Sequence, residues 1–247
     1  MIKIEADLHT HTVSSGHAYS TVDELARSAG RKGLKLIAIT DHGPNIPGGP
    51  HEYHFGNLAV IPDRISGVDI LKGIEANILD NGRLDLPEER LKALDFVAAG
   101  LHEHTGHNLS SREEYTGAII RAMENPLVKM ITHPVNVNYP VDIEKIVRAA
   151  RANDVILEIN ASSYSPVKKS QRGIKALDTK LCQLAKRYKV PLSLNSDAHY
   201  HAEVGQIETL EEIIKKANLR ERDVINVSRE RLLSYLYPDR YRKKQIV

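Results

Sequence analysis

The chain has 247 residues, of which 41% are hydrophobic and 27% are charged. This composition is typical of a globular protein with a buried core, and it excludes disordered, collagen-like and low-complexity chains. The formal net charge is only +2, so no global field favours nucleic acid or an anionic membrane. Histidine is the unusual residue type, because the 12 histidines equal the 10 Tyr and 2 Phe residues combined.

The chain carries no sign of a membrane span or of a second domain. No apolar run approaches the roughly 20 residues of a membrane-spanning helix, and the N-terminus enters strand-like sequence directly. We therefore expect no secretory signal and a cytosolic location. The single cysteine, Cys182, lies in an apolar helical pattern, which predicts a packing role. Without repeats or long linkers, residues 1–247 are expected to form one domain.

Short apolar runs alternate with amphipathic segments along the chain, a pattern typical of a βα repeat. Only a short run, Val224–Val227, stands where an eighth strand would follow, so an eighth βα unit is expected to be truncated or absent. Seven apolar runs are predicted to be strands covered on both faces: Ile2–Leu8, Leu36–Thr40, Ile70–Glu75, Phe96–Leu101, Val128–Thr132, Val155–Ile159 and Leu192–Leu194.

The helices between these runs have recognisable start signals. Thr21 and Ser111 each stand three residues before a glutamate, which predicts two capping boxes, and Asp142 is a predicted N-cap. The loop Gly43–Leu58 holds four glycines, three prolines and two histidines, so it is predicted to contain no regular helix or strand.

Two architectures fit this order of elements, a (β/α) barrel and an open doubly wound sheet, and a length near 250 residues is typical of the barrel. Both place their chemistry at the carboxyl ends of the strands. Six of the seven predicted strands end beside a histidine or a carboxylate. The remaining strand, Val155–Ile159, is followed by Asn160. The residues at the other six ends are Asp7, His9, His11, Asp41, His42, Glu75, His102, His133, Asp197 and His199.

One histidine at a strand end is usually structural, but these positions converge if the strands close into a barrel. His9 and His11 are two residues apart on an extended segment, so both imidazoles project to one side. Imidazoles and carboxylates packed together without a cation would leave polar groups desolvated. The pattern therefore predicts a metal cluster. This ligand chemistry suits Zn, Mn or Fe, and the lack of cysteine ligands favours open coordination positions.

In this ordered set the sequence resembles the PHP (polymerase and histidinol phosphatase) metallophosphoesterases. The family pattern has a D-x-H-x-H element, an I-T-D-H element, an internal Glu, two further His and a terminal D-A-H. Here these elements are residues 7–11, 39–42, Glu75, His102, His133 and 197–199. The compact length and the stretch Ser14–Ser20 are most similar to the small YcdX-like phosphatases of that family.

The resemblance implies a distorted (β/α)7 TIM-like barrel with three divalent ions at the carboxyl ends of the strands. Zinc is the favoured metal, with Mn or Fe as alternatives. The first ion is expected at His9, His11, Asp197 and Glu75, the second at His17, His42 and His199, and the third at Glu75, His102 and His133.

Such a cluster suits hydrolysis of small phosphomonoesters by a metal-bridging hydroxide, because metal ions activate water and neutralise phosphoryl charge. Asp197 is a candidate to orient the hydroxide, and His201 or Asp41 are candidates for the general acid. Asp41 has the alternative role of orienting a ligand imidazole. Arg172 is a candidate contact for substrate phosphate, although a solvated charge run explains its segment as well.

Three other functions are weighed against this one. A metal-dependent amidohydrolase usually needs a carboxylated lysine, and no lysine ends the third, fourth or fifth predicted strand. A nucleic-acid phosphoesterase or exonuclease needs clustered cations interleaved with aromatic residues, which the sequence lacks. A metal-binding module without catalysis is the third alternative.

Overall fold

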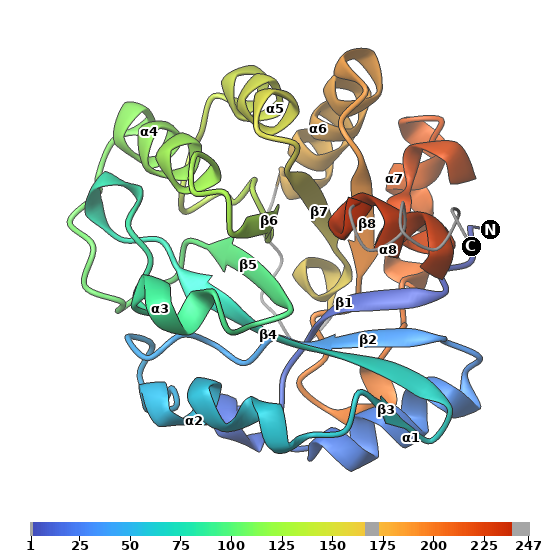
Figure 1. Ribbon diagram of the computed structural model, residues 1–247. Coiled ribbons are helices and arrows are strands. Elements are labelled where there is room, and N and C mark those ends of the chain that lie inside the picture. Colours follow the sequence, from blue (N-terminus) through green and yellow to red (C-terminus); the bar gives the residue numbers. More distant parts are fainter. Residues whose placement is uncertain (1, 166–172, 239–247) are drawn as a thin grey trace.

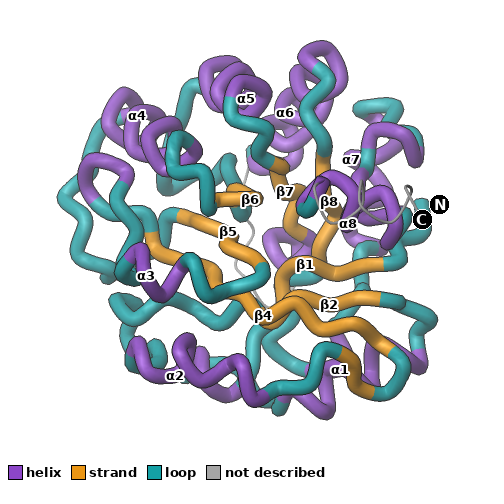
Figure 2. Tube along the Cα trace, viewed as in Figure 1, coloured by secondary structure: helices purple, strands orange, loops and turns teal. Residues whose placement is uncertain are grey.

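The computed structural model describes residues 2–165 and 173–238, so Arg172 lies outside the described residues. Within them, parallel strands form a nearly closed barrel with helices around it (Figures 1 and 2). The fold is the predicted barrel, not the open doubly wound sheet. In order around the barrel, the strands are β1 (Ala6–Thr10), β2 (Leu36–Ile39), β4 (Val68–Asn77), β5 (Phe96–Gly100), β6 (Val128–Ile131), β7 (Ile156–Asn160) and β8 (Leu192–Asn195).

The predicted strands overlap the observed ones, with differences at their ends. The first begins at Ala6 and not at Ile2, because Ile2 packs against the core before the chain enters the sheet. An apolar run alone does not distinguish a strand from a packed extended segment. The two-residue strand β3 (Arg64–Ile65) was not predicted, and it pairs antiparallel with the start of β4.

The helices begin where their capping signals stand. Thr21 and Ser111 both form complete capping boxes, and the Asp142 side chain accepts a hydrogen bond from the Lys145 backbone N–H. None of the described helices is both long and apolar enough to cross a membrane. The helices are α1 (Val22–Arg31), α2 (Glu52–Asn57), α3 (Glu88–Leu91), α4 (Arg112–Met123), α5 (Ile143–Ala152), α6 (Ile174–Tyr188), α7 (Glu211–Lys216) and α8 (Arg229–Leu236).

The prediction that the loop Gly43–Leu58 contains no helix is wrong, because α2 lies inside it. The prolines and three of the four glycines crowd into residues 43–50, which leaves a short stretch with only Gly56 as a helix breaker. His51 caps this helix, and its Nδ1 accepts a hydrogen bond from the Tyr53 backbone N–H at 3.2 Å.

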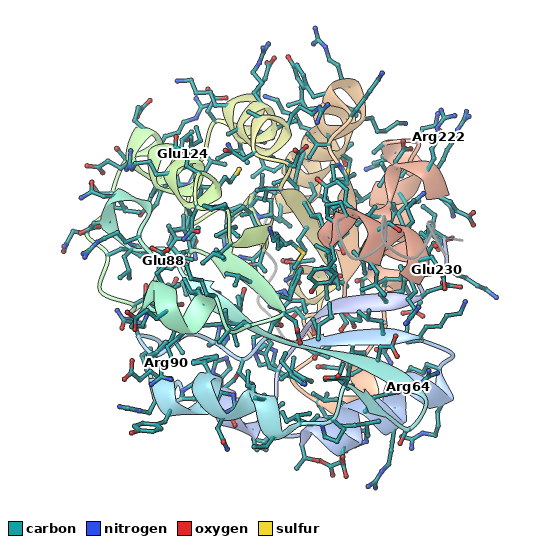
Figure 3. All side chains as sticks on the ribbon, viewed as in Figure 1. Arg64, Glu88, Arg90, Glu124, Arg222 and Glu230 are labelled. Carbon is teal, nitrogen blue, oxygen red and sulfur yellow. The ribbon has the colours of Figure 1, made fainter. Side chains whose placement is uncertain are left out.

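The apolar core lies both inside the barrel and between the barrel and its helices. Leu232 and Leu236 of α8 belong to the inner cluster with Ala6, Leu36 and Phe96, which are the first residues of three strands. Helix α8 therefore covers the amino end of the barrel and leaves the carboxyl end for the site. Cys182 is buried in the outer core. The charged residues labelled in Figure 3 lie at the periphery of the molecule.

The barrel closes between β1 and β8 without a regular ladder. On the carboxyl side, the His11 N–H donates to the Ala198 carbonyl at 2.9 Å. Below it, the buried Asn226 side chain donates to the Ala6 and Leu194 carbonyls at 2.8 and 2.7 Å, and it accepts from the Leu194 N–H at 3.1 Å. Asn226 lies in a 3-10 helix, Ile225–Val227, so a side chain bridges the gap where an eighth strand was expected to be truncated or absent.

Candidate metal centre

The nine predicted ligands meet at the carboxyl end of the barrel. His9 lies on β1, Glu75 lies on β4, and the others follow β1, β2, β5, β6 and β8. His9, His11 and Glu75 are fully buried at the bottom of the cluster. Above them a cavity of about 460 Å³ is lined by His17, His42, Glu75, His102, His133, Asp197 and His199.

Glu75 stands at the centre of the cluster, and its two carboxylate oxygens face different imidazoles. This arrangement allows one side chain to reach two metal positions. The Oε2 atom lies 3.2 Å from His9 Nε2, 3.6 Å from His11 Nε2 and 2.9 Å from His42 Nδ1, whereas Oε1 lies 3.2 Å from His102 Nε2 and 2.9 Å from His133 Nε2.

Asp197 faces the same space from the other side of the barrel seam. Its Oδ1 atom lies 3.5 Å from His9 Nε2 and 3.2 Å from His11 Nε2, so two imidazoles converge there with the carboxylates of Asp197 and Glu75. Asp197 has a φ of 53°, and His133 has a φ of 29°. Non-glycine residues held in this region cost about 1–3 kcal/mol each and cluster at functional sites.

The three histidines expected at the second metal position are His17, His42 and His199. The ring of His17 stacks on the other two, with centroid distances of 5.0 Å to His42 and 4.9 Å to His199. His17 is exposed at the mouth, whereas His42 is buried. The loop after β1 thus returns His17 to the cluster.

Several buried polar atoms at this centre have no hydrogen-bond partner. They are close to one another but not aligned for hydrogen bonds, and leaving such groups unpaired costs about 1–3 kcal/mol each. Bound cations would satisfy them, so the described residues fit a metal cluster. The atoms are His9 Nε2, His11 Nε2, His42 Nδ1, Glu75 Oε2 and His102 Nε2.

The second nitrogen of three imidazoles is held by a neighbouring side chain. His9 Nδ1 lies 2.7 Å from Glu158 Oε1, and His102 Nδ1 lies 2.7 Å from Asn77 Oδ1. His11 Nδ1 lies 3.0 Å from the Ser15 hydroxyl. Each of these contacts makes Nδ1 the donor and leaves Nε2 as the metal-binding atom, as is usual for histidine ligands.

The ionisation states that ligation requires are favoured at His11, His42 and Glu75. Burial lowers the pKa of His42 to about 4, despite the nearby charge of Glu75. Burial, together with the charges of His42 and His199, also lowers the pKa of His11 well below its usual value. Burial raises the pKa of Glu75, but the charges of the surrounding imidazoles outweigh it and lower the pKa well below the usual range. Neutral imidazoles and ionised carboxylates are the forms that bind metal. At His9 and His133 burial lowers the pKa, but the carboxylates of Glu158 and Glu75 outweigh it and raise the pKa above its usual value.

Asp41 lies behind the ligands and is fully engaged. It accepts hydrogen bonds from the Thr12 N–H at 2.7 Å, the Thr12 hydroxyl at 2.8 Å and the Ser15 hydroxyl at 2.7 Å, and it contacts His54 Nε2 at 3.1 Å. Because the Ser15 proton goes to Asp41, the Ser15 oxygen accepts from His11. This geometry favours the orienting role of Asp41 over the general-acid role.

His201, the other candidate for the general acid, is not among the described residues that line the cavity. It contacts Ser20, whose hydroxyl accepts from the His201 N–H at 2.9 Å, and its ring lies 4.2 Å from that of Tyr200. Of the five histidines outside the predicted ligand set, His104 lines the cavity.

Sequence reasoning missed Glu158 and Asn77, which hold two of the imidazoles. Glu158 is the only charged residue in the apolar run Val155–Ile159, and a lone carboxylate in a strand covered on both faces is itself a signal. Asn77 carries no such signal, because its role depends on which side chain the loop after β5 brings to it.

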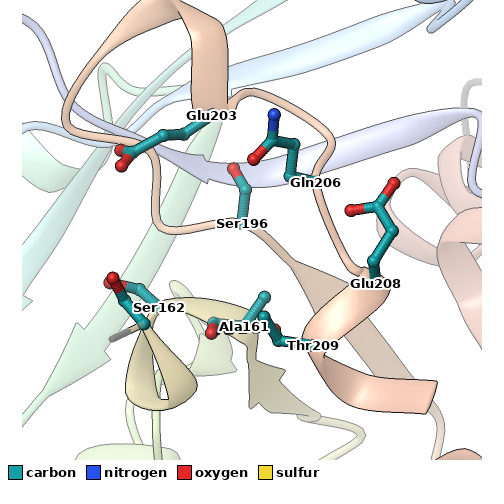
Figure 4. A pocket seen from close by; sticks show the side chains of 8 residues that line it. Ala161, Ser162, Ser196, Glu203, Gln206, Glu208 and Thr209 are labelled. Carbon is teal, nitrogen blue, oxygen red and sulfur yellow. Dashed lines mark hydrogen bonds between the residues drawn. The ribbon is translucent and has the colours of Figure 1, made fainter. Parts of the chain in front are cut away.

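A second cavity, of about 150 Å³, is lined by Ala161 and Ser196, the chain neighbours of Asn160 and Asp197 (Figure 4). Its described lining has hydroxyl, amide and carboxylate groups, including Ser162, Ser196 and Glu203, but no imidazole. The predicted ligands therefore belong to the larger cavity.

Comparisons with known proteins identify relatives of this chain. The PHP domain model matches residues 7–162. A protein of Caldanaerobacter subterraneus named a probable phosphatase is 46% identical over 242 residues, which cover 98% of this chain and 94% of that protein. A probable phosphatase of a Thermoanaerobacter species is 46% identical over 236 residues, 95% of each chain.

The fold is also similar to a crystal structure of histidinol phosphate phosphatase from Lactococcus lactis, complexed with Zn, L-histidinol and phosphate. That comparison has a TM-score of 0.60 at 19% identity and covers 87% of this chain and 94% of the other. The match to the domain model and the two full-length relatives show that the chain belongs to the PHP domain family.

Proposed function

We propose that the protein is a metal-dependent phosphatase that hydrolyses small phosphomonoesters. The enzyme class, a hydrolase of phosphate esters, follows from the family and from the names of its relatives. One observation carries the metal dependence: Glu75 stands between two sets of imidazoles, four of whose buried nitrogens lack hydrogen-bond partners, at the floor of an open cavity.

We assign three metal positions to the nine residues. When bound, the ions supply an activated water near neutral pH and neutralise charge on the phosphoryl group. Zinc is the favoured ion because imidazoles and carboxylates suit it, with Mn or Fe as alternatives. The first position is His9, His11, Asp197 and Glu75, the second is His17, His42 and His199, and the third is Glu75, His102 and His133. Ligand atoms lie close together in three groups of described residues, which are His9, His11 and Glu75, then His11, His42 and His199, and then His42, Glu75 and His102. His11 and His42 therefore also lie near a position other than their own.

Asp197 is proposed to orient the attacking water as well as to bind metal. Its other oxygen, Oδ2, accepts a hydrogen bond from Asn160 Nδ2 at 3.2 Å, which holds the carboxylate toward the cavity that both residues line. A carboxylate fixed in this way keeps one oxygen directed at His9 and His11.

The cavity suits a small ester better than a nucleic acid. Its volume of about 460 Å³ is in the range of small-molecule sites. None of the described residues that line it is Lys or Arg, whereas a nucleic-acid backbone needs clustered cations. Polar groups of Asn136, Asn138, Tyr139 and Glu103 also line the cavity and would meet the alcohol part of the ester.

The test is to measure bound metal by elemental analysis, remove it with a chelator, and assay both forms on p-nitrophenyl phosphate, small phosphoesters and single-stranded DNA. We expect about three equivalents of metal and phosphate release that requires them. Metal without turnover of any ester would favour the non-catalytic module, and faster turnover of DNA would favour the nuclease.

Glu75→Gln should remove the shared carboxylate. We expect it to lose at least one equivalent of metal and on the order of 100-fold in activity, because an amide presents one oxygen and no charge to two metal positions. Asp178→Asn is the matched control, since Asp178 is another buried carboxylate and its contact is Tyr164. A Glu75→Gln variant that keeps its full metal content would contradict the bridging role.

A further inference from the structure

Glu158 on β7 is a fully buried carboxylate that the proposed chemistry does not use. Its Oε1 atom accepts hydrogen bonds from His9 Nδ1 at 2.7 Å and Asn195 Nδ2 at 2.9 Å. Its Oε2 atom accepts from the His133 backbone N–H at 2.8 Å and Asn160 Nδ2 at 3.1 Å. One side chain thus contacts four residues, from or next to four strands, at the floor of the site.

The four partners of Glu158 are all donors. The Asn195 oxygen accepts from the Leu8 N–H and the Ser193 hydroxyl, which directs the Asn195 NH₂ group at Glu158. The Asn160 oxygen accepts from the Ser163 N–H, which directs the Asn160 NH₂ group in the same way.

Four donors require an ionised carboxylate. Its two oxygens offer about four lone-pair sites, so each donor is satisfied. A glutamine would present an NH₂ group to two of the donors and could satisfy only the other two. The hydrogen bonds around this position therefore specify glutamate, and a neutral side chain of the same size does not replace it.

Two of the donors belong to proposed ligands of different metal positions. His9 is assigned to the first position, and the contact at Nδ1 leaves its Nε2 directed at Glu75 Oε2, 3.2 Å away. His133 is assigned to the third, and Glu158 holds its backbone where φ is 29° and its Nε2 lies 2.9 Å from Glu75 Oε1.

We propose that Glu158 is a positioning residue that fixes His9 and His133 together, and so links the first and third metal positions beneath the cluster. This inference rests on the proposed metal centre. A carboxylate behind a histidine ligand fixes its tautomer and increases its basicity, and losing such a partner typically costs 10–100-fold in metal affinity.

The test is Glu158→Gln in the full chain, loaded with Zn²⁺ and titrated with a competing chelator. We expect the ions at the first and third positions to be removed at a chelator concentration about 10–100-fold lower than in the wild type. The ion at His17, His42 and His199 should be removed at the same chelator concentration as in the wild type. The Co²⁺-loaded variant should show a changed visible absorption spectrum. Asp178→Asn should behave as the wild type in both measurements.

A measurement on the wild type does not depend on the folding of a variant. In the Zn²⁺-loaded protein, ¹H–¹⁵N NMR of the histidine rings should place a hydrogen-bonded proton on His9 Nδ1. A proton on His9 Nε2, or an unchanged ion affinity in a folded Glu158→Gln variant, would overturn the role of Glu158. A wild-type protein that binds no ion would instead overturn the proposed metal centre.

Discussion

Gly100, the last residue of β5, shows how closely the site is packed around individual atoms. A Cβ atom at this position would lie 2.3 Å from Thr132 Oγ1, 2.9 Å from His133 Cε1 and 3.2 Å from His102 Cε1. The two rings therefore reach Glu75 Oε1 only because no side chain projects from this strand end.

Gly100→Ala is predicted to displace the rings of His102 and His133 and to empty the third metal position. We expect a loss of about one equivalent of metal at matched chelator strength and a cost of about 1–3 kcal/mol in the free energy of unfolding, as for other overpacked sites. Elemental analysis and urea unfolding measure the two effects.

The control is Gly117→Ala on α4, where the new Cβ would meet only the flexible guanidinium of Arg121, at 3.1 Å. It should keep all of its metal and gain up to about 1 kcal/mol in helix propensity. Full metal content in Gly100→Ala would show that the rings have more room than the structure gives them.

At this scale the sequence predicted the residues that face the cluster but not those behind them. His9, His42 and Glu75 could be predicted because the carboxyl ends of barrel strands converge whatever the details of packing. Ser15 and Asn77 could not, because their roles depend on which ring nitrogen each loop brings within hydrogen-bond distance. Arg172 stays a prediction, since it lies outside the described residues.

At the scale of the elements, the buried carboxylate of Asp178, which has a raised pKa, links α6 to the 3-10 helix Ala161–Tyr164. Asp178 on α6 is 4% exposed and accepts a hydrogen bond from the Tyr164 hydroxyl. Burial raises the pKa of Asp178 from 3.8 to about 7, against the lowering effect of that bond. Between about pH 4 and 7 the folded protein thus binds a proton that the unfolded chain has lost, so this group makes stability fall as pH rises.

Asp178→Asn is predicted to stabilise the protein in a pH-dependent manner. The free energies of unfolding of the wild type and the variant should be equal near pH 4. The variant should become more stable than the wild type as pH rises, until the difference levels off above pH 7. The limit is about 4 kcal/mol, from about three pH units at 1.36 kcal/mol each. Urea unfolding of metal-free protein from pH 4.5 to 8 measures it. A difference that does not change with pH would exclude this account.

Elements could be predicted where a short pattern fixes them. The capping boxes at Thr21 and Ser111 satisfy backbone groups with side chains three residues away, so no distant contact is needed to place α1 and α4. Helix α2 was not predicted because the glycines and prolines were counted over the whole loop Gly43–Leu58. A helix needs only a short stretch with few such residues, and α2 occupies one.

For the molecule as a whole, one side-chain amide makes several of the hydrogen bonds that close the barrel between β1 and β8. Asn226 satisfies three buried backbone groups, two on Leu194 and one on Ala6. The sequence of the run Val224–Val227 does not predict this role of Asn226, because the role depends on β1 and β8 lying on either side of the amide. The sequence predicted a truncated eighth unit but not what fills its place.

Asn226→Ala should therefore destabilise the entire barrel. Three unsatisfied buried groups at about 1–3 kcal/mol each predict a loss of about 3 kcal/mol or more in the free energy of unfolding. The control is Asn153→Ala at the exposed end of α5, which should cost less than about 1 kcal/mol. Equal midpoints for the two variants in urea would show that the seam does not limit stability.

The same seam sets an order of events during protein synthesis. The free edge of β1 faces β8 and Asn226, which a ribosome reaches 216 residues after Thr10. At about 5–20 residues per second, that edge waits roughly 10–40 seconds for its partners. An unpaired strand edge is a template for aggregation. The nascent chain therefore carries an unpaired β1 edge until β8 and Asn226 emerge, and the proposed first metal position stays incomplete until Asp197 emerges.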